Sequence, residues 1–176
     1  SSVKAMGKLS TFAHFQLPRT LFQLSFTCTP HCRSMITVRT PINIALCKYW
    51  GKEDEELIIP CNSSISATLS TEHLFTETTV SIQHSEATED SFFLNGEQCA
   101  IGKRLRDCIQ RLRMEARDHF PQFAAPLLIC SWNSFPTAAG MASSASGLAA
   151  VCLALWKLYG LSGVVSRERL SCIARM

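Results

Sequence analysis

Two apolar segments joined by a loop of small residues lie between residues 127 and 159. Residues 127–132 (Leu-Leu-Ile-Cys-Ser-Trp) predict a buried strand, and residues 148–159 predict a helix with an apolar face. That face is formed by residues at helical spacing: Leu148, Val151, Cys152, Leu155 and Tyr159. The first amides of a helix have no partner within it, and the helix dipole adds partial positive charge there. The order strand, tight loop, helix therefore predicts an anion site at the loop.

The loop has the side chains that such a site needs. Small residues would let a phosphate approach the backbone closely, and hydroxyls would add donors: Ala138, Ala139, Gly140, Ala142, Ser143 and Ser144. Because Ser144 lies four residues before Leu148, we expect it to point inward at the mouth of the helix. The loop is not a Walker P-loop, since no Gly-Lys-Ser/Thr follows the glycine. Tight packing of a small-residue turn is the alternative interpretation of the same pattern.

Charge and composition exclude several classes of protein. The longest apolar run, residues 148–156, is less than half of the roughly 20 residues that span a bilayer, so no membrane helix is predicted. Residues 1–34 contain four of the 17 basic residues (Lys4, Lys8, Arg19 and Arg33) and no acidic residue. The remainder is therefore near neutral, which argues against a nucleic-acid-binding domain. The five histidines lie far apart in the sequence, so no protein metal site is predicted.

The cysteines indicate a reducing compartment. Their number, nine, is odd, and no Cys-x-x-Cys occurs. Cys47, Cys130 and Cys152 lie inside apolar segments, so we expect them to be buried free thiols. The prediction is a cytoplasmic protein, with peroxisomal or organellar targeting left open.

The chain divides at residue 35. The acid-free residues 1–34 resemble a transit peptide, but two prolines and two cysteines fit a presequence poorly, and we expect an extension outside the fold, with Met35 as an alternative start. Residues 35–176 form the predicted domain. We expect a final helix, capped by Ser166, to be cut by the end of the chain, so that the sequence is a fragment.

Other elements follow from periodicity. Residues 36–46 alternate as a strand interrupted near Pro41, and residues 78–82 and 91–94 predict paired strands. Asn95-Gly96 predicts a tight turn. Residues 103–119 predict a helix with an inner stripe, and Gly160 is expected to end the helix that begins near residue 148. The inner stripe consists of Leu105, Ile109, Leu112 and Ala116.

The loop carries a recognisable motif. Pro136-x-x-x-Gly140-x-x-Ser-Ser-Ala145 resembles the phosphate-binding motif of the GHMP superfamily of small-molecule kinases. The longer string, Asn133-x-Phe-Pro-Thr-Ala-Ala-Gly-x-Ala-Ser-Ser-Ala-x-Gly147, is similar to the motif of the mevalonate diphosphate decarboxylase family. The leucine usual in that family is Met141 here, a change of similar volume.

A second block of residues supports the resemblance independently of the loop motif. Pro41-Ile-Asn-Ile-Ala-Leu-Cys-Lys-Tyr-Trp-Gly-Lys52, followed by Asn62-Ser-Ser-Ile-Ser66, is similar to the N-terminal signature of the same family, and Phe93-Leu-Asn-Gly96 resembles its hairpin. Two solvated lysines at a strand end are the alternative for Lys48 and Lys52. The resemblance covers roughly residues 36–176.

The resemblance implies a set of site residues. Asn43, Lys48 and Ser144 are the implied catalytic residues, and the implied substrate-binding residues are Tyr49, Trp50, Gly51, Lys52 and Arg104. Arg104 aligns only with a one-residue deletion, and a solvated helix charge is its alternative. The chain is expected to turn at Gly51, which brings Tyr49 and Lys52 to one diphosphate. The implied ATP-phosphate site consists of Pro136, Ala138, Ala139, Gly140, Ala142, Ser143 and Ser144.

The resemblance also implies a fold and an activity. The fold is α+β, a GHMP kinase N-terminal domain of the ribosomal protein S5 domain 2 type, truncated here. The activity is ATP-dependent decarboxylation of mevalonate 5-diphosphate to isopentenyl diphosphate, ADP, phosphate and carbon dioxide, in isoprenoid and sterol biosynthesis. Mg²⁺ would come with ATP, and the full-length protein would be a homodimer. The family's catalytic aspartate and carboxylate-binding arginine would lie beyond residue 176, so we expect the chain as given to be inactive.

Two other functions remain alternatives. One is a different GHMP kinase that phosphorylates another alcohol and releases no carbon dioxide. The other is a truncated product that binds without catalysis.

Overall fold

The computed structural model describes residues 35–47, 50–55, 59–83, 87–136 and 143–175. Several predictions concern residues outside these ranges and are not tested by the fold: the extension 1–34, Lys48, Tyr49, Ala138, Ala139, Gly140 and Ala142.

A five-stranded mixed sheet forms the centre of the domain. Its order is β1 (Met35–Pro41), β6 (Phe75–Ile82), β9 (Leu127–Asn133), β7 (Ser91–Leu94) and β8 (Glu97–Cys99). All neighbours are antiparallel except β7 and β9, which are parallel. The predicted pairing of residues 78–82 with 91–94 is wrong, because β9 lies between them. β9 alternates buried and less buried residues along its whole length, and β6 and β7 take its two edges.

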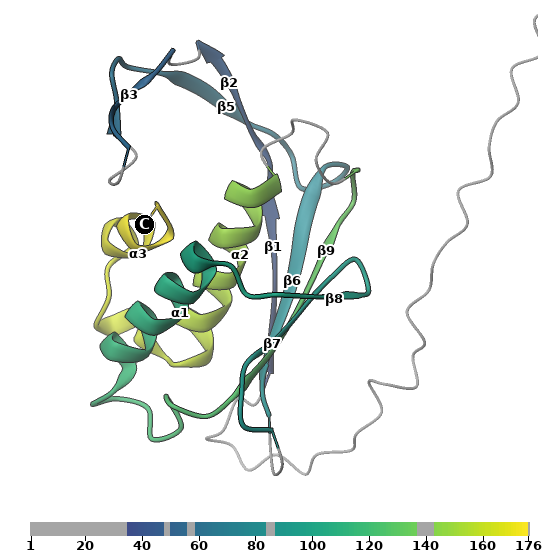
Figure 1. Ribbon diagram of the computed structural model, residues 1–176, viewed down its shortest axis with the longest axis vertical. Coiled ribbons are helices and arrows are strands. Elements are labelled where there is room, and N and C mark those ends of the chain that lie inside the picture. The colour runs from purple at the N-terminus through teal and green to yellow at the C-terminus, as the bar shows by residue number, and fades with distance from the viewer. Residues whose placement is uncertain (1–34, 48–49, 56–58, 84–86, 137–142, 176) are drawn as a thin grey trace, which may run out of the picture.

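Three helices cover one face of this sheet (Figure 1). They are α1 (Lys103–Ala116), α2 (Ser143–Leu158) and α3 (Arg167–Arg175), with a short 3₁₀ helix at Leu161–Gly163. The core lies between the sheet and the helices, and α2 contributes most to it. The three helices predicted from periodicity are confirmed, although α1 ends at Ala116 and α2 begins five residues before Leu148.

The turn and cap residues behave as predicted. Asn95 and Gly96 both have positive φ (51° and 89°), as expected for the tight turn between β7 and β8. Gly160 follows α2 in the left-handed region, with φ of 67°. The Ser166 hydroxyl accepts a hydrogen bond from Arg169 N at 3.2 Å and so caps α3.

Two narrow ribbons extend beyond the sheet. β2 (Asn43–Cys47) pairs with β5 (Ile65–Thr68), and β3 (Lys52–Asp54) pairs with β4 (Ile59–Pro60). We call the described residues between 43 and 68 the arm. It rises from the end of β1 and bends over the helical layer (Figure 1). Leu69 N donates to Ile42 O at 3.0 Å, so the chain leaves the body and returns to it at neighbouring points.

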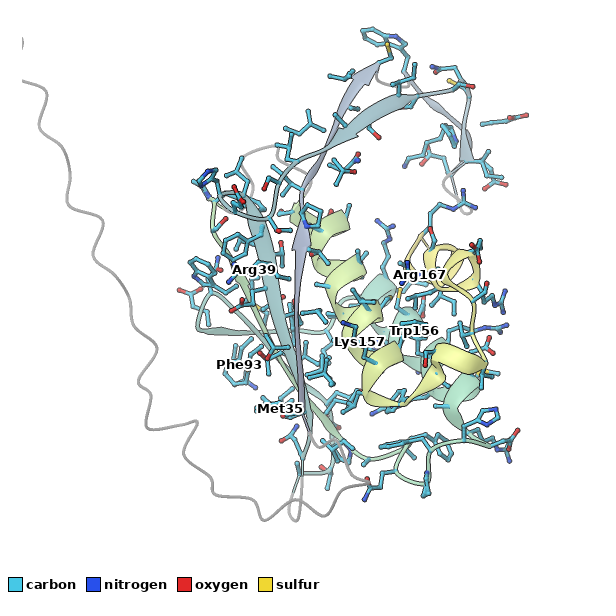
Figure 2. The ribbon with its side chains drawn as sticks, turned by 180° about the vertical axis from the view of Figure 1, so that it is seen from behind. Met35, Arg39, Phe93, Trp156, Lys157 and Arg167 are labelled. Carbon is cyan, nitrogen blue, oxygen red and sulfur yellow. The ribbon has the colours of Figure 1, made fainter. Side chains whose placement is uncertain are left out.

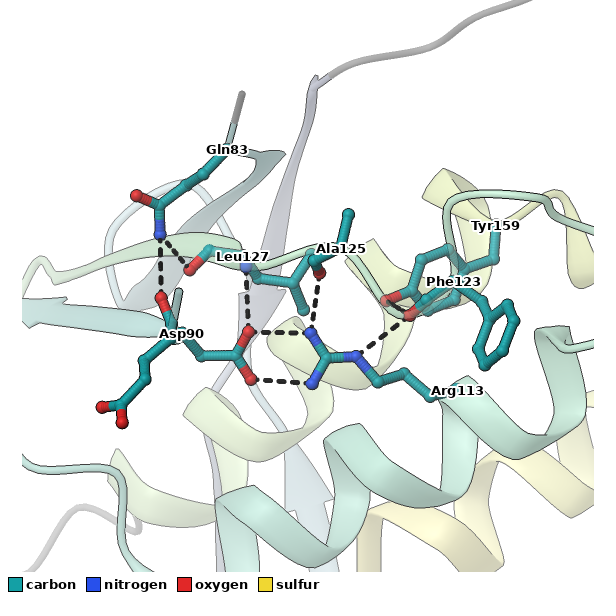
Figure 3. A network of polar contacts seen from close by, with 8 residues as sticks. Gln83, Asp90, Arg113, Phe123, Ala125, Leu127 and Tyr159 are labelled. Carbon is teal, nitrogen blue, oxygen red and sulfur yellow. Dashed lines mark hydrogen bonds and ion pairs between the residues drawn. The ribbon is translucent and has the colours of Figure 1, made fainter. Parts of the chain in front are cut away.

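An ion pair fastens the loop that precedes β9 (Figure 3). Arg113 donates to both carboxylate oxygens of Asp90 at 2.7 and 2.9 Å, and to the carbonyls of Phe123 and Ala125 at 3.0 and 2.8 Å. Asp90 also accepts from Leu127 N at 2.9 Å. Burial alone would lower the pKa of Arg113, but the bonds to Asp90 outweigh it and the pKa is raised.

The seven cysteines in the described part of the chain are free thiols. Cys152 is buried as predicted, and Cys130 is half-buried. The predicted burial of Cys47 is wrong, because its apolar segment belongs to the exposed arm. Within the described ranges, no helix combines the length and apolar character needed to cross a membrane.

Candidate functional site

The first turn of α2 is open to solvent and has no acidic residue. Ser144 is exposed and Ser143 is partly exposed. Ser144 lies on the side of α2 that carries Val151 and Leu155, as its spacing predicts, but unlike them it is not buried. The buried residue of this turn is Ser146, which shares a line with Ala150 and Ala154 along the face that packs on the sheet. Exposure leaves the Ser144 hydroxyl free to meet a ligand from solvent.

The loop that leads to α2 is anchored where it leaves β9. Ser134 exchanges backbone and side-chain bonds with Phe75: Ser134 N donates to Phe75 O at 3.0 Å, and Phe75 N donates to Ser134 Oγ at 2.9 Å. Asn133 Oδ1 accepts from Thr76 Oγ1 at 2.7 Å. Phe135 is 5% exposed and Pro136 is exposed. The loop therefore starts from a fixed point beside the start of β6.

A pair of buried hydroxyls joins the first turn of α2 to β1. Thr40 Oγ1 lies 3.0 Å from Ser146 Oγ and 3.0 Å from Ser146 O, and Ser146 Oγ donates to Pro41 O at 3.1 Å. The motifs did not predict this pair, because Ser146 occupies a position that the family motif leaves variable. The available signal was the spacing of Ser146 from Ser143, because residues three apart are neighbours on one side of a helix.

The residues implied for substrate binding lie on the arm. Asn43 begins β2, and its amide donates to Thr68 Oγ1 at 3.0 Å across the ribbon. Trp50 is 94% exposed, and its backbone N–H donates to Asn62 Oδ1 at 3.3 Å. Lys52 Nζ lies 3.1 Å from Glu55 Oε2, whose side chain is 81% exposed. Such an exposed ion pair is weak, so an incoming anion can replace the carboxylate.

The turn that would bring Tyr49 and Lys52 together is not tested, because Tyr49 lies outside the described residues, but the backbone at Gly51 does not itself require glycine. Gly51 has no positive φ, and a Cβ there would meet Cys61 Sγ at 3.6 Å, an ordinary contact. Cys61 N donates to Gly51 O at 3.0 Å and so holds this point of the arm. A side chain at residue 51 is therefore compatible with the ribbon as it stands.

Arg104 lies next to the end of α3. It is exposed in the first turn of α1, and its guanidinium donates to the carbonyl of Arg175 at 3.4 Å. Within the described residues, no hydrogen bond or ion pair joins it to the arm or to the first turn of α2. The structure thus brings the arm and α2 to the end of β1, and leaves Arg104 beside α3.

The donors at the start of α2 fit a phosphate. Unpartnered helix amides, two serine hydroxyls and the positive end of a 16-residue helix suit a negative charge. Among the described residues, no three histidine, cysteine or acidic side chains group as metal ligands. A Mg²⁺ ion at such a site would be held largely by phosphate oxygens, which that ion prefers.

Comparison with known proteins agrees with both motif blocks. A family model described as the diphosphomevalonate decarboxylase-like N-terminal domain matches residues 40–176. The chain belongs to the diphosphomevalonate decarboxylase-like family. The Schizosaccharomyces pombe diphosphomevalonate decarboxylase is 48% identical over 149 residues, which are 79% of this chain and 37% of that protein.

Solved structures give the same result. An X-ray structure of mevalonate 5-diphosphate decarboxylase superposes with a TM-score of 0.68 at 42% identity, over 81% of this chain and 38% of that one. A structure of the mevalonate diphosphate decarboxylase from Enterococcus faecalis, which describes its mevalonate diphosphate mediated ATP binding mechanism, superposes with a TM-score of 0.62. The identity is 41%, over 80% of this chain and 42% of that one. The predicted α+β class, with the GHMP-type N-terminal domain of this decarboxylase family, is confirmed.

The chain spans little more than a third of the curated relatives that it matches. The matched part is 37% of the S. pombe decarboxylase and 35% of the rat one. The matched region contains the arm, the loop after β9 and α2.

Proposed function

We propose that the protein to which this chain belongs decarboxylates mevalonate 5-diphosphate with ATP, and that this chain supplies the ATP-phosphate loop and part of the substrate site. The observation that carries the proposal is the family match over residues 40–176, which includes both motif blocks. The hydrogen bond from Ser146 to Pro41 O supports it, because it brings the first turn of α2 to the base of the arm. A role in isoprenoid and sterol biosynthesis, a cytoplasmic location and a homodimeric whole protein belong to the same proposal.

Each part of the chain has a distinct task in this proposal. The amides at the start of α2, with Ser143 and Ser144, bind the phosphates of the nucleotide. Ser144 stands where the nucleotide and the substrate hydroxyl meet. Lys52 exchanges its exposed partner Glu55 for the substrate diphosphate, and Asn43 orients its neighbours.

ATP supplies the phosphoryl group that makes the substrate hydroxyl a good leaving group. The protein contributes positioning and electrostatic stabilisation. A structure of MDDEF in complex with MVAPP, AMPPCP and magnesium, 41% identical to this chain, supports ATP with Mg²⁺ as the ligand.

Nucleotide binding by the 176-residue chain tests the proposal. Isothermal titration calorimetry with ATP and MgCl₂ should give saturable binding. Ser144→Ala should weaken it at least about tenfold, because a hydrogen bond to a charged group contributes about 1.5–3 kcal/mol. Ser162→Ala is the matched control, since Ser162 is an exposed serine beyond the far end of α2. Absence of saturable binding, or equal effects of the two variants, would refute the nucleotide site.

Turnover is a separate measurement. We expect no sustained phosphate release from ATP and mevalonate 5-diphosphate by the 176-residue chain. Sustained release by that chain would contradict the expectation. Carbon dioxide release by the whole protein distinguishes a decarboxylase from a GHMP kinase of another alcohol.

A further inference from the structure

A row of buried polar side chains crosses the sheet beneath the first turn of α2. Thr40, Thr76 and Asn133 are register neighbours on β1, β6 and β9, and all three are less than 10% exposed. Thr76 Oγ1 donates to Asn133 Oδ1, and Thr40 Oγ1 contacts Thr76 O at 3.4 Å. Ser146 of α2, 4% exposed, lies on the Thr40 end of this row.

The hydroxyls of Thr40 and Ser146 have a consistent hydrogen-bond assignment. Thr40 donates to Ser146, either to its carbonyl or to its hydroxyl oxygen, both at 3.0 Å. Ser146 uses its own proton toward Pro41 O at 3.1 Å. Both hydroxyls are buried, so neither can exchange these partners for water without a local opening.

The partners of Ser146 lie where the arm begins. Pro41 ends β1, Asn43 starts β2, and Ile42 between them is 0% exposed. Ile42 O accepts from Leu69 N, where the chain returns from the arm. Ser146 therefore contacts the base of the arm, and Ser143 and Ser144 precede it in the same first turn of α2.

We propose that Thr40 and Ser146 are positioning residues: their paired hydroxyls hold the first turn of α2 against the base of the arm, and thereby fix the nucleotide-binding end of the helix relative to the substrate-binding ribbon. The identity of the two ligands rests on the proposed function. The link between α2 and the arm rests on the hydrogen bonds alone.

A second buried hydroxyl pair, within the sheet, provides a control for the Thr40–Ser146 pair. Thr78 and Ser131 are also hydrogen-bonded and buried, at 0% and 6% exposed. They join β6 to β9, which backbone hydrogen bonds already hold in register. Loss of that pair removes no link between a helix and the arm. Thr78→Ala is therefore a matched control for Thr40→Ala.

Amide hydrogen exchange tests the link without any ligand. Ser146→Ala and Thr40→Ala are each expected to raise exchange about tenfold in two separate segments, residues 143–150 and residues 42–47, because each removes a buried hydrogen bond between the first turn of α2 and the end of β1. Thr40→Ser keeps the hydroxyl and should restore slow exchange. Faster exchange in α2 alone, or an equal effect of Thr78→Ala on residues 42–47, would overturn the proposal.

Nucleotide affinity tests the consequence. ATP with Mg²⁺, titrated into each variant, should bind about threefold to tenfold more weakly to Ser146→Ala and Thr40→Ala, within the energy of one hydrogen bond. Thr40→Ser and Thr78→Ala should bind as the unaltered chain does. Unchanged affinity in Ser146→Ala overturns the positioning role. Absence of binding by the unaltered chain refutes the proposed nucleotide site instead, and leaves the exchange experiment to decide the link.

Discussion

Replacing Asp90 with alanine removes one side of the ion pair that fastens the loop before β9. The Arg113 guanidinium then keeps only the carbonyls of Phe123 and Ala125 as partners. Leu127 N loses its acceptor at a residue that is 0% exposed. The side chains of Arg113 and Asp90 are 20% and 17% exposed, so water can compensate only part of the loss.

The expected destabilisation follows from these contacts. Removing one partner of a fully buried ion pair costs about 3–5 kcal/mol, and the remaining exposure brings the value toward the lower limit. The unpaired Leu127 N–H adds about 1 kcal/mol. We therefore expect Asp90→Ala to lower the free energy of unfolding by about 4 kcal/mol. Asp90→Asn keeps an acceptor for Leu127 N and removes the charge, so its effect should be smaller.

The pair formed by Arg39 and Glu77 is the matched control. Its shortest distance, 2.8 Å, is close to the 2.7 Å between Arg113 and Asp90, but its side chains are 47% and 37% exposed. Arg39 projects from the face of the sheet opposite the helices (Figure 2). An exposed pair contributes less than about 1 kcal/mol, so Glu77→Ala should lie below that value.

Urea unfolding followed by far-ultraviolet circular dichroism measures both variants. The slope of free energy against urea should stay unchanged, so that the midpoints report stability. Equal midpoint shifts for Asp90→Ala and Glu77→Ala would refute the reasoning, because burial would then not govern the strength of these pairs.

Two further predictions concern the end of α2. Gly160→Ala should lower the free energy of unfolding by about 1 kcal/mol, because Gly160 has a φ of 67°. Gly163→Ala should be nearly neutral, because the backbone of Gly163 lies outside the left-handed region and a Cβ there would meet nothing within 4 Å. Equal midpoint shifts in urea would contradict this prediction. Burial raises the pKa of Tyr159 above 10, so the stability that its bound proton provides is complete below pH 10 and is lost as pH rises through the folded pKa. Tyr159→Phe should reduce the fall of the urea midpoint above pH 10, and an unchanged alkaline profile would show that Tyr159 is not the titrating group.

Local sequence patterns predicted the elements but not all of their neighbours. Helical spacing, Gly160 and Ser166 correctly predicted the three helices and where two of their ends lie. The pairing of residues 78–82 with 91–94 was wrong because β9 pairs through both of its hydrogen-bonding edges and so lies between them, and strand order is a property of the whole sheet. Alternation in a sequence predicts the faces of a strand and not its partners.

The candidate site shows a similar division. The residues that the motif blocks imply for the site stay a prediction, and the motifs did not predict that Ser144 is exposed or that Lys52 is paired with Glu55. Helical spacing places Ser144 and Leu148 on the side of α2 that carries the buried residues Val151 and Leu155, but Ser144 lies in the first turn and is exposed. Polar residues such as Thr40 and Ser146 are expected outside by composition alone, and only their mutual hydrogen bonds make their burial possible.

The hydrogen bond between Ile42 and Leu69 has a consequence for how the protein can vary. Because the two ends of the arm meet there, the arm is an excursion whose removal or lengthening leaves the strand order of the body unchanged. Doubling the length of such a closed excursion costs only about 0.6 kcal/mol in chain entropy. The ribbon implied in substrate binding can therefore gain or lose residues almost independently of the stability of the domain that supports it.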